Sequence, residues 1–404
     1  MSYKYTFKKC IAVIMLILLT GCGNSTEPVK TEQPVTITFS KPKECTEAFQ
    51  EIIRRFESDN PLIKVNLIEM PLHSVERRNV YLTELSGGSS SVDVYWLEDV
   101  WLKQFSALDY LEELEAADTS GYVDNLLDYS TYNGKLYSLP VAMDSSLIFY
   151  RRDLIKTPVN TWDDINKISQ ELLEDKTVDY GFTYLYDGGD EAICNAAEYV
   201  WGSGGSLFDP ESNMAEGLKN YKDTAAKLPY DKNGTTISTL FRNGRIAFMQ
   251  SFGINKKSLE NEAFDVKGKL GITNILSLDG KRVQSLYKTY ALAINKHSLE
   301  KEAAKKLIKF WSSAEIQQLQ AERTGLMPVI SEVFESERVL EDNPYFKDIP
   351  KKLSNMARRP SLTNYSEISY EMEKILNRFL KDEIDENIAE REIKKILEVS
   401  YVED

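Results

Sequence analysis

The sequence predicts an α/β fold in which a mostly parallel sheet is covered by helices. Runs with the apolar pattern of strands occur in turn with runs that have apolar residues at helical spacing. The chain has 404 residues, which is more than one hydrophobic core usually organises, so two domains are expected. Its 42% apolar residues, with 22 Tyr and 16 Phe, are enough to build both cores.

The first elements after the N-terminal segment give the order strand, helix, strand, helix, strand. Strands are predicted at Val35–Phe39, Ile63–Ile68 and Val92–Trp96. The first helix carries apolar side chains from Ala48 to Phe56 and ends at Asn60-Pro61, and the second ends at Gly87-Gly88. This order implies a parallel sheet, and ligands bind beyond the carboxyl ends of such strands.

Later segments are mostly helical. Thr161 is the expected N-cap of a helix that opens at Trp162. A late strand is predicted at Tyr290–Asn295, followed by one long amphipathic helix over Leu299–Gln320. A pair of helices with charged outer faces is predicted over Tyr365–Val399.

The N-terminus resembles a bacterial lipoprotein signal. Three lysines precede the apolar run Ile11–Leu19, which is too short to span a bilayer and ends in Leu19-Thr20-Gly21-Cys22. The prediction is a signal peptide at residues 1–21, a lipidated Cys22 and a polar tether at residues 22–34. The alternative is an ordinary signal or a membrane anchor with an incidental cysteine. The lipoprotein interpretation predicts attachment to the cell membrane on its extracytoplasmic face.

Composition and motifs argue against several classes of function. A net charge of −14 excludes nonspecific binding of nucleic acid. Two histidines and the lack of common hydrolase and nucleotide-binding motifs argue against an enzyme. Cys45 and Cys194 do not form a Cys-x-x-Cys pair, so no metal or cofactor is predicted, and both are expected to be buried or free.

Several short runs, spread over nearly all of the chain after the tether, are similar in order and spacing to one known family. They are Asn60–Val65, Val92–Val94, Gly134–Pro140, Leu147–Leu154, Thr161–Asp164, Gly204–Asp209, Phe241–Met249 and Gly325–Pro328. The chain resembles the extracellular solute-binding proteins that serve ABC-type sugar importers, and among them the trehalose/maltose-binding members.

The resemblance implies a two-lobed periplasmic-binding-protein-like fold with a hinge and a cleft. The expected lobes are discontinuous: residues 35–143 with 288–328 form the N-terminal lobe, and residues 144–287 with 329–404 form the C-terminal lobe. A monomer is expected to hold a carbohydrate, a di- or oligosaccharide, in the cleft and to deliver it to the permease in the membrane. The alternatives are a sensor lipoprotein on the same fold or a glycoside-processing enzyme.

The resemblance also assigns candidate sugar-binding residues. Carboxylates, Arg and aromatic rings suit the hydroxyls and the C–H faces of a sugar. The candidates are Glu98, Asp144, Phe252, Tyr290, Arg359, Glu47 and Arg78, where Glu44 and Arg77 are the alternatives to the last two. Ala142 and Phe252 replace a Tyr and a Trp of the similar members, so the pocket is altered and trehalose or maltose is not implied. The competing explanation is core packing for each aromatic residue and a surface ion pair for each charged one.

Overall fold

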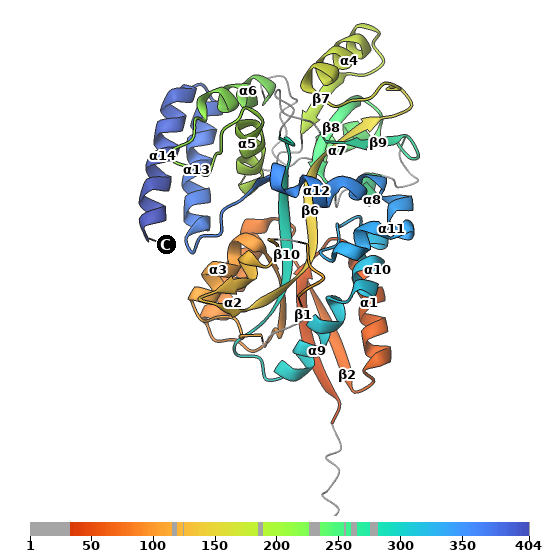
Figure 1. Ribbon diagram of the computed structural model, residues 1–404, viewed down its shortest axis with the longest axis vertical. Helices are drawn as coiled ribbons and strands as arrows, with labels where there is room; N and C mark the ends of the chain where they lie inside the picture. Colours follow the sequence, from red (N-terminus) through yellow and green to blue (C-terminus); the bar gives the residue numbers. More distant parts are fainter. Residues whose placement is uncertain are drawn as a thin grey trace, which may run out of the picture. The chain divides into compact units, whose positions relative to one another are not determined.

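The computed structural model describes residues 33–114, 119–123, 125–184, 189–225, 235–253, 256–259, 265–274 and 282–403 (Figure 1). The predicted signal segment, Cys22 and nearly all of the tether lie outside these residues. Residues Pro34–Asp404 form one compact unit, which contains the described helices and strands. None of the helices within the described ranges is both long enough and apolar enough to cross a membrane.

A mixed sheet forms the centre of this unit. Its strands run in the spatial order β2-β1-β3-β10-β6-β8-β7, with β9 added to β6 and β11 added to β10. Their bounds are β1 Val35–Pro42, β2 Ile63–Met70, β3 Val94–Glu98, β6 Ser138–Arg151, β7 Tyr180–Tyr184, β8 Ile246–Phe252, β9 Leu270–Thr273, β10 Leu286–Ile294 and β11 Ala357–Arg358. A separate hairpin joins β4 Thr131–Tyr132 to β5 Lys135–Leu136.

Parallel pairing holds where the sequence order is strand, helix, strand. β1 is parallel to both β2 and β3, and β7 is parallel to β8. The central strands differ, because β10 is antiparallel to β3 and to β6, and β6 is antiparallel to β8 and β9.

Two long strands connect the two ends of the sheet. The first half of β6 pairs with β10, while its second half, from Ser146, pairs with β8 and β9. Figure 1 shows β6 and β10 running side by side through the middle of the unit. The lobe boundaries expected at residues 143/144 and 287/288 fall within these two strands.

The helices around β1, β2 and β3 follow the predicted pattern with one difference. Their bounds are α1 Thr46–Asp59, α2 Ser74–Ser86, α3 Asp99–Ala107, α9 Lys301–Trp311 and α10 Ala314–Thr324. The single helix predicted over Leu299–Gln320 is wrong, because it is divided into α9 and α10. The hydroxyls of Ser312 and Ser313 donate to the carbonyls of Ile308 and Phe310, each at 2.8 Å, and such local bonds compete with helical ones.

The bounds of the remaining helices are α4 Trp162–Glu174, α5 Asp190–Gly202, α6 Ala215–Ala225, α7 Thr235–Arg242, α8 Lys256–Leu259, α11 Glu337–Asp342, α12 Ile349–Lys352, α13 Tyr365–Leu380 and α14 Glu386–Glu403. Of these helices, α4 packs on β7 and β8, α7 packs on β8, and α11 packs on α10. Short 3₁₀ helices lie at Asp128–Ser130, Ser331–Glu335, Pro344–Asp348 and Leu353–Asn355. The predicted C-terminal helix pair is confirmed, and α13 and α14 pack beside α5 and α6 (Figure 1). The predicted cap is also confirmed, since Thr161 forms a capping box with Asp164.

Candidate functional site

A cluster of buried charges lies at the carboxyl end of β3. The Arg359 guanidinium contacts Glu98 at 3.1 Å, Asp99 at 2.7 Å and Asp190 at 2.5 Å. Glu98 also accepts from Arg77 at 2.7 Å. We call Arg77, Glu98, Asp99, Asp190 and Arg359 the ionic cluster. It joins α2 and β3 to α5 and to the segment after β11, which are far apart in sequence.

The ionic cluster is removed from solvent, and its charges stabilise one another. The Arg359 side chain is 0% exposed and that of Glu98 is 4% exposed. Burial alone would raise the pKa of Glu98, but Arg359 and Arg77 outweigh this and hold the pKa below its usual value. Burial would lower the pKa of Arg359, but Asp190, Asp99 and Glu98 raise it well above its usual value. Glu98 and Arg359 therefore carry their charges at neutral pH.

Asp144 lies next to this cluster, where β6 passes β10. One carboxylate oxygen of Asp144 accepts from the backbone N–H groups of Ser145 and Gly253, each at 2.8 Å. A Cβ atom at position 253 would lie only 2.8 Å from that oxygen, so the contact requires glycine there. Gly253 directly follows Phe252, so the bond also fixes the end of β8 against β6.

Phe252 and Tyr290 complete the group of predicted residues that the structure brings together. The Lys288 ammonium lies 4.0 Å from the centre of the Phe252 ring and 2.9 Å from Glu191. Tyr290 pairs with Glu98 of β3 on one side and with Ala142 of β6 on the other. Burial raises the pKa of Tyr290 well above its usual value, and the negative charges of Asp144 and Glu98 add to this.

Two predicted residues lie outside this group. Glu47 is exposed in the first turn of α1. Arg78 donates to Gln104 at 2.6 Å and faces Glu367 at 3.8 Å, away from Glu98. The structure therefore favours Arg77 over Arg78 in the group. It also favours Glu44 over Glu47, because Glu44 is half-buried whereas Glu47 is exposed.

Several charged residues of the candidate site were not identified from the sequence. Asp99 follows Glu98 directly and so shares the end of β3, a position that could have revealed it. Asp190 lies in Asp187-Gly188-Gly189-Asp190, which suggests a turn rather than a buried carboxylate. Lys288 is a cation inside the otherwise apolar strand β10, which is a usable signal. Asp190 also accepts from the Tyr365 hydroxyl at 2.6 Å, and nothing in the sequence pairs these two residues.

Trp96 and Trp101 have structural positions. Trp96 is 2% exposed and packs against Phe49 and Tyr290, with ring centres 5.0 and 5.6 Å apart. Trp101 is 3% exposed and lies under the Arg77 guanidinium at 5.3 Å. Both rings therefore pack against residues of the candidate site, Trp96 against Tyr290 and Trp101 against Arg77.

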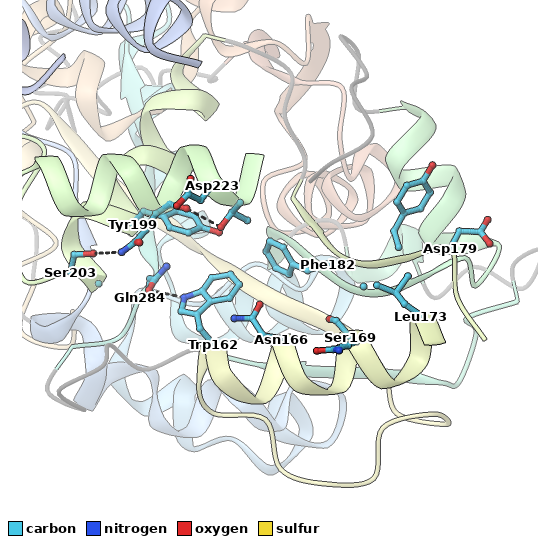
Figure 2. Close-up of a pocket in the computed structure, with 16 residues that line it drawn as sticks. Trp162, Asn166, Ser169, Leu173, Asp179, Phe182, Tyr199, Ser203, Asp223 and Gln284 are labelled. Atoms are coloured by element: carbon cyan, nitrogen blue, oxygen red, sulfur yellow. Dashed lines mark hydrogen bonds between the residues drawn. The ribbon is translucent and has the colours of Figure 1, made fainter. Parts of the chain in front are cut away.

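A separate cavity of about 550 Å³ lies between α4 with β7 on one side and α5 with α6 on the other (Figure 2). Its lining combines aromatic rings with amides and hydroxyls. The residues that line it are Trp162, Asn166, Ser169, Gln170, Leu173, Asp179, Tyr180, Gly181, Phe182, Tyr199, Gly202, Ser203, Asn220, Asp223, Thr224 and Gln284. We call it the lateral pocket, since no residue of β1, β3 or the ionic cluster lines it.

No group of acidic, cysteine and histidine side chains suited to a metal ion occurs in the parts of the chain that the structure describes. Cys45 and Cys194 are both free, Cys194 is buried, and Cys45 is half-buried. Burial raises the pKa of the Cys45 thiol to about 12, so this thiol is protonated at neutral pH.

Comparisons with known proteins identify the family. Residues 51–347 match the family model of bacterial extracellular solute-binding proteins. A probable ABC transporter-binding protein of Deinococcus radiodurans is 24% identical over 76% of this chain and 79% of its own length. The galactooligosaccharide-binding protein of Bacillus subtilis is 23% identical over 80% of each chain.

Solved structures share the fold. Maltose-bound MalE3 of T. maritima superposes with a TM-score of 0.79 at 25% identity, over 90% of this chain and 99% of that one. The GacH receptor of Streptomyces glaucescens gives a TM-score of 0.80 at 21% identity, over 91% and 99% of the two chains. The predicted two-lobed α/β fold is thus confirmed. With its two-lobed sheet and with most of its length matched by the family model, the chain belongs to the bacterial extracellular solute-binding proteins.

Proposed function

We propose that this protein binds a di- or oligosaccharide where the paired strands β6 and β10 pass from one half of the sheet to the other, and that it delivers the sugar to an ABC-type permease. We call the place formed there by Glu98, Asp144, Phe252 and Tyr290 the crossing site. The observation that carries the proposal is the juxtaposition of four residues at the junction of the two halves of the sheet. Strand pairing sets Glu98 beside Tyr290 and Asp144 beside Lys288, and the Lys288 ammonium contacts the ring of Phe252. A relative named for galactooligosaccharide binding and a similar structure bound to maltose support a carbohydrate ligand. The expected lobe boundaries are part of this proposal.

The chemistry of these side chains suits a neutral sugar. Asp144 and Glu98 would accept hydrogen bonds from hydroxyl groups, and Phe252 and Tyr290 would pack on a ring face. Arg359 would act mainly by holding Glu98 in place, because its own guanidinium is fully buried. Since Asp144 is also buried, the two lobes must open for the sugar to enter and close around it afterwards.

A thermal-shift screen against mono-, di- and oligosaccharides, with amino acids and peptides as controls, tests the proposal. A sugar present at about 100 times its Kd should stabilise the protein by about 2.7 kcal/mol. Unchanged oligosaccharide after incubation is expected of a binding protein, whereas hydrolysis products would favour the enzyme alternative. A screen in which only amino acids or peptides stabilise the protein would overturn the carbohydrate assignment.

Two substitutions in the predicted site should weaken binding of the sugar that the screen finds. Asp144→Asn is expected to cost about 1.5–3 kcal/mol, which is roughly a ten- to hundred-fold rise in Kd, because it removes a charged acceptor. Phe252→Ala should cost about 1–3 kcal/mol through lost apolar contact. Calorimetric titration measures both. Wild-type affinity in both variants would show that the sugar binds elsewhere.

The choice between neighbouring acids can be tested in the same titration. Glu44→Gln is expected to weaken binding, while the matched substitution Glu47→Gln should leave Kd unchanged because Glu47 is exposed. The reverse result would place Glu47 in the site.

The lipid anchor is a further part of the proposal. The run Leu19-Thr20-Gly21-Cys22 supports cleavage before Cys22 and acylation of its thiol. Cells that express the wild type should incorporate labelled fatty acid into the protein, and cells that express Cys22→Ala should not. Equal labelling of the two proteins would refute lipidation at Cys22.

A further inference from the structure

The lateral pocket is built within one part of the chain. Its lining residues all fall between positions 162 and 284, on α4, β7, α5, α6 and the segment before β10. Figure 2 shows the α4 side chains Asn166 and Ser169 on one side, Tyr199 and Asp223 on the other, and Phe182 between them. A volume of about 550 Å³ lies within the range of roughly 300–1,000 Å³ that is usual for small-molecule sites.

Aromatic rings form one wall of the lateral pocket and are held in place. Trp162 stacks on Tyr199 with ring centres 5.5 Å apart and meets the edge of Phe182 at 4.9 Å. The indole N–H of Trp162 donates to the Gln284 side-chain carbonyl at 2.8 Å. This bond fixes both the ring and the amide, so the wall is organised before any ligand arrives.

Some polar atoms of the residues that line the lateral pocket lack partners among the described residues. The Gln284 amide nitrogen and the Ser169 hydroxyl are buried, and neither has a hydrogen-bond partner among the described residues. Buried donors without partners are costly, so a ligand hydroxyl that drew either side chain toward the pocket would supply the missing hydrogen bond. Asn166, Asn220 and Thr224 supply further amides and a hydroxyl along the lining.

The charge of the lining narrows the class of ligand. None of the sixteen residues that line the described pocket is Lys, Arg or His, so an anionic ligand would find no counter-charge there. One of the two carboxylates, that of Asp179, is already paired with Arg245 at 2.5 Å. Aromatic surface combined with neutral donors and acceptors is the combination that suits an uncharged, hydroxyl-rich ring.

We propose that the lateral pocket is a second carbohydrate site, which binds a neutral sugar unit between α4 with β7 and α5 with α6. It is distinct from the crossing site, and it does not depend on closure of the lobes, because its walls come from residues 162–284 alone. It would hold one part of a longer glycan while another part occupies the crossing site, or a separate glycan chain.

Fluorine NMR of the full chain labelled with fluorotryptophan tests this proposal. The chain has five tryptophans, and the resonance that is missing in Trp162→Phe identifies Trp162. Maltotriose and cellotriose serve as neutral probes, and glucuronate serves as an anionic control. A saturable shift of the Trp162 resonance is expected with at least one trisaccharide and not with glucuronate. The shift should persist in the double variant Asp144→Asn/Phe252→Ala, which removes the crossing site.

Two matched pairs of variants locate the binding. Gln284→Leu should raise the Kd read from Trp162 roughly two- to ten-fold, the loss expected for one neutral hydrogen bond, while Gln318→Leu on α10 should not change it. Asn166→Leu should also weaken binding, and the neighbouring Lys167→Leu, which does not line the pocket, should not.

Four outcomes would overturn the second site. No shift of Trp162 at millimolar trisaccharide would show that the pocket binds no sugar. A shift that disappears in the double variant would report closure around the crossing site instead. Equal responses in Gln284→Leu and the wild type, or an equal response to glucuronate, would rule out the proposed recognition. A shift that persists while calorimetry detects no binding at the crossing site would refute only the proposed function.

Discussion

Arg359→Ala is expected to lower the free energy of unfolding by about 3–5 kcal/mol, the cost typical of removing one partner from a buried ion pair. Three carboxylates, those of Glu98, Asp99 and Asp190, would lose their shared counter-charge in a region closed to water. Arg77 would still neutralise Glu98, but no other ion pair within the described residues reaches Asp99 or Asp190. Urea unfolding followed by fluorescence measures the loss.

Two further variants serve as controls for this substitution. Arg323→Ala removes a solvent-exposed pair with Glu51 and should cost less than about 1 kcal/mol. Arg359→Lys keeps the charge but cannot reach three carboxylates with one ammonium group, so it should recover only part of the loss. A loss below about 1 kcal/mol in Arg359→Ala would contradict a stabilising role for the ionic cluster.

The ionic cluster also predicts how stability depends on acid. Burial tends to raise the pKa of Asp190, but Arg359 and Lys288 lower it below its usual value of 3.8. The pKa of Glu98 is likewise lowered below 4.5. The folded state therefore binds protons at Asp190 and Glu98 less tightly than the unfolded chain does. The resulting stabilisation is present above pH values of 3.8 and 4.5, respectively, and is lost as the pH falls below them. The free energy of unfolding of Arg359→Ala should therefore fall less steeply than that of the wild type as the pH is lowered.

Much of the fold could be predicted because local patterns determine it. Apolar alternation located β1 and β2, helical spacing located α1, and Thr161 with Asp164 marked the start of α4. The division between α9 and α10 was missed because it depends on two serine hydroxyls that bond back to their own helix. Hydrophobic spacing does not report such bonds.

The candidate site was predicted in part, and the reason is geometric. Glu98 and Tyr290 were proposed from the resemblance to sugar-binding proteins, and the pairing of β3 with β10 sets them side by side. Asp190 and Arg359 are 169 residues apart in sequence, and only the folded chain brings them together. Arg77 and Arg78 are neighbours on one helix and so point in different directions. Arg77 therefore contacts Glu98 of the ionic cluster, whereas Arg78 contacts Gln104.

Glu198→Gln is expected to stabilise the protein increasingly as the pH rises. Glu198 is 1% exposed on α5 and is surrounded by strands. It accepts from the backbone of Leu286 at 3.0 Å, from the Ser146 hydroxyl at 3.2 Å and from the Gln250 amide. Burial raises the pKa of Glu198 to about 8, because these bonds do not offset the cost of a charge so far from water.

The sign of the pH dependence follows from this raised pKa. The folded state keeps the Glu198 proton up to about pH 8, whereas the unfolded chain releases it near the usual value of 4.5. The contribution of Glu198 to the free energy of unfolding is therefore full below about pH 4.5. It is lost between there and about pH 8, at about 1.4 kcal/mol per pH unit. Glutamine has no proton to lose, so the advantage of Glu198→Gln over the wild type should grow by roughly 2–4 kcal/mol across that interval.

Urea unfolding of both proteins at several pH values between about 5 and 8 measures the difference, and the exposed Glu171→Gln is the control that should keep the wild-type profile. Glutamine can replace the protonated glutamate closely. Its carbonyl would still accept from Leu286, and its amide would donate to the Gln250 carbonyl oxygen, which is buried without a partner among the described residues. A protonated Glu198 would also need an acceptor for its O–H group. The Gln250 carbonyl oxygen becomes that acceptor once the Gln250 amide is turned over. Parallel stability profiles for Glu198→Gln and the wild type would mean that Glu198 is ionised in the folded protein, with α5 held to the strands by a buried carboxylate.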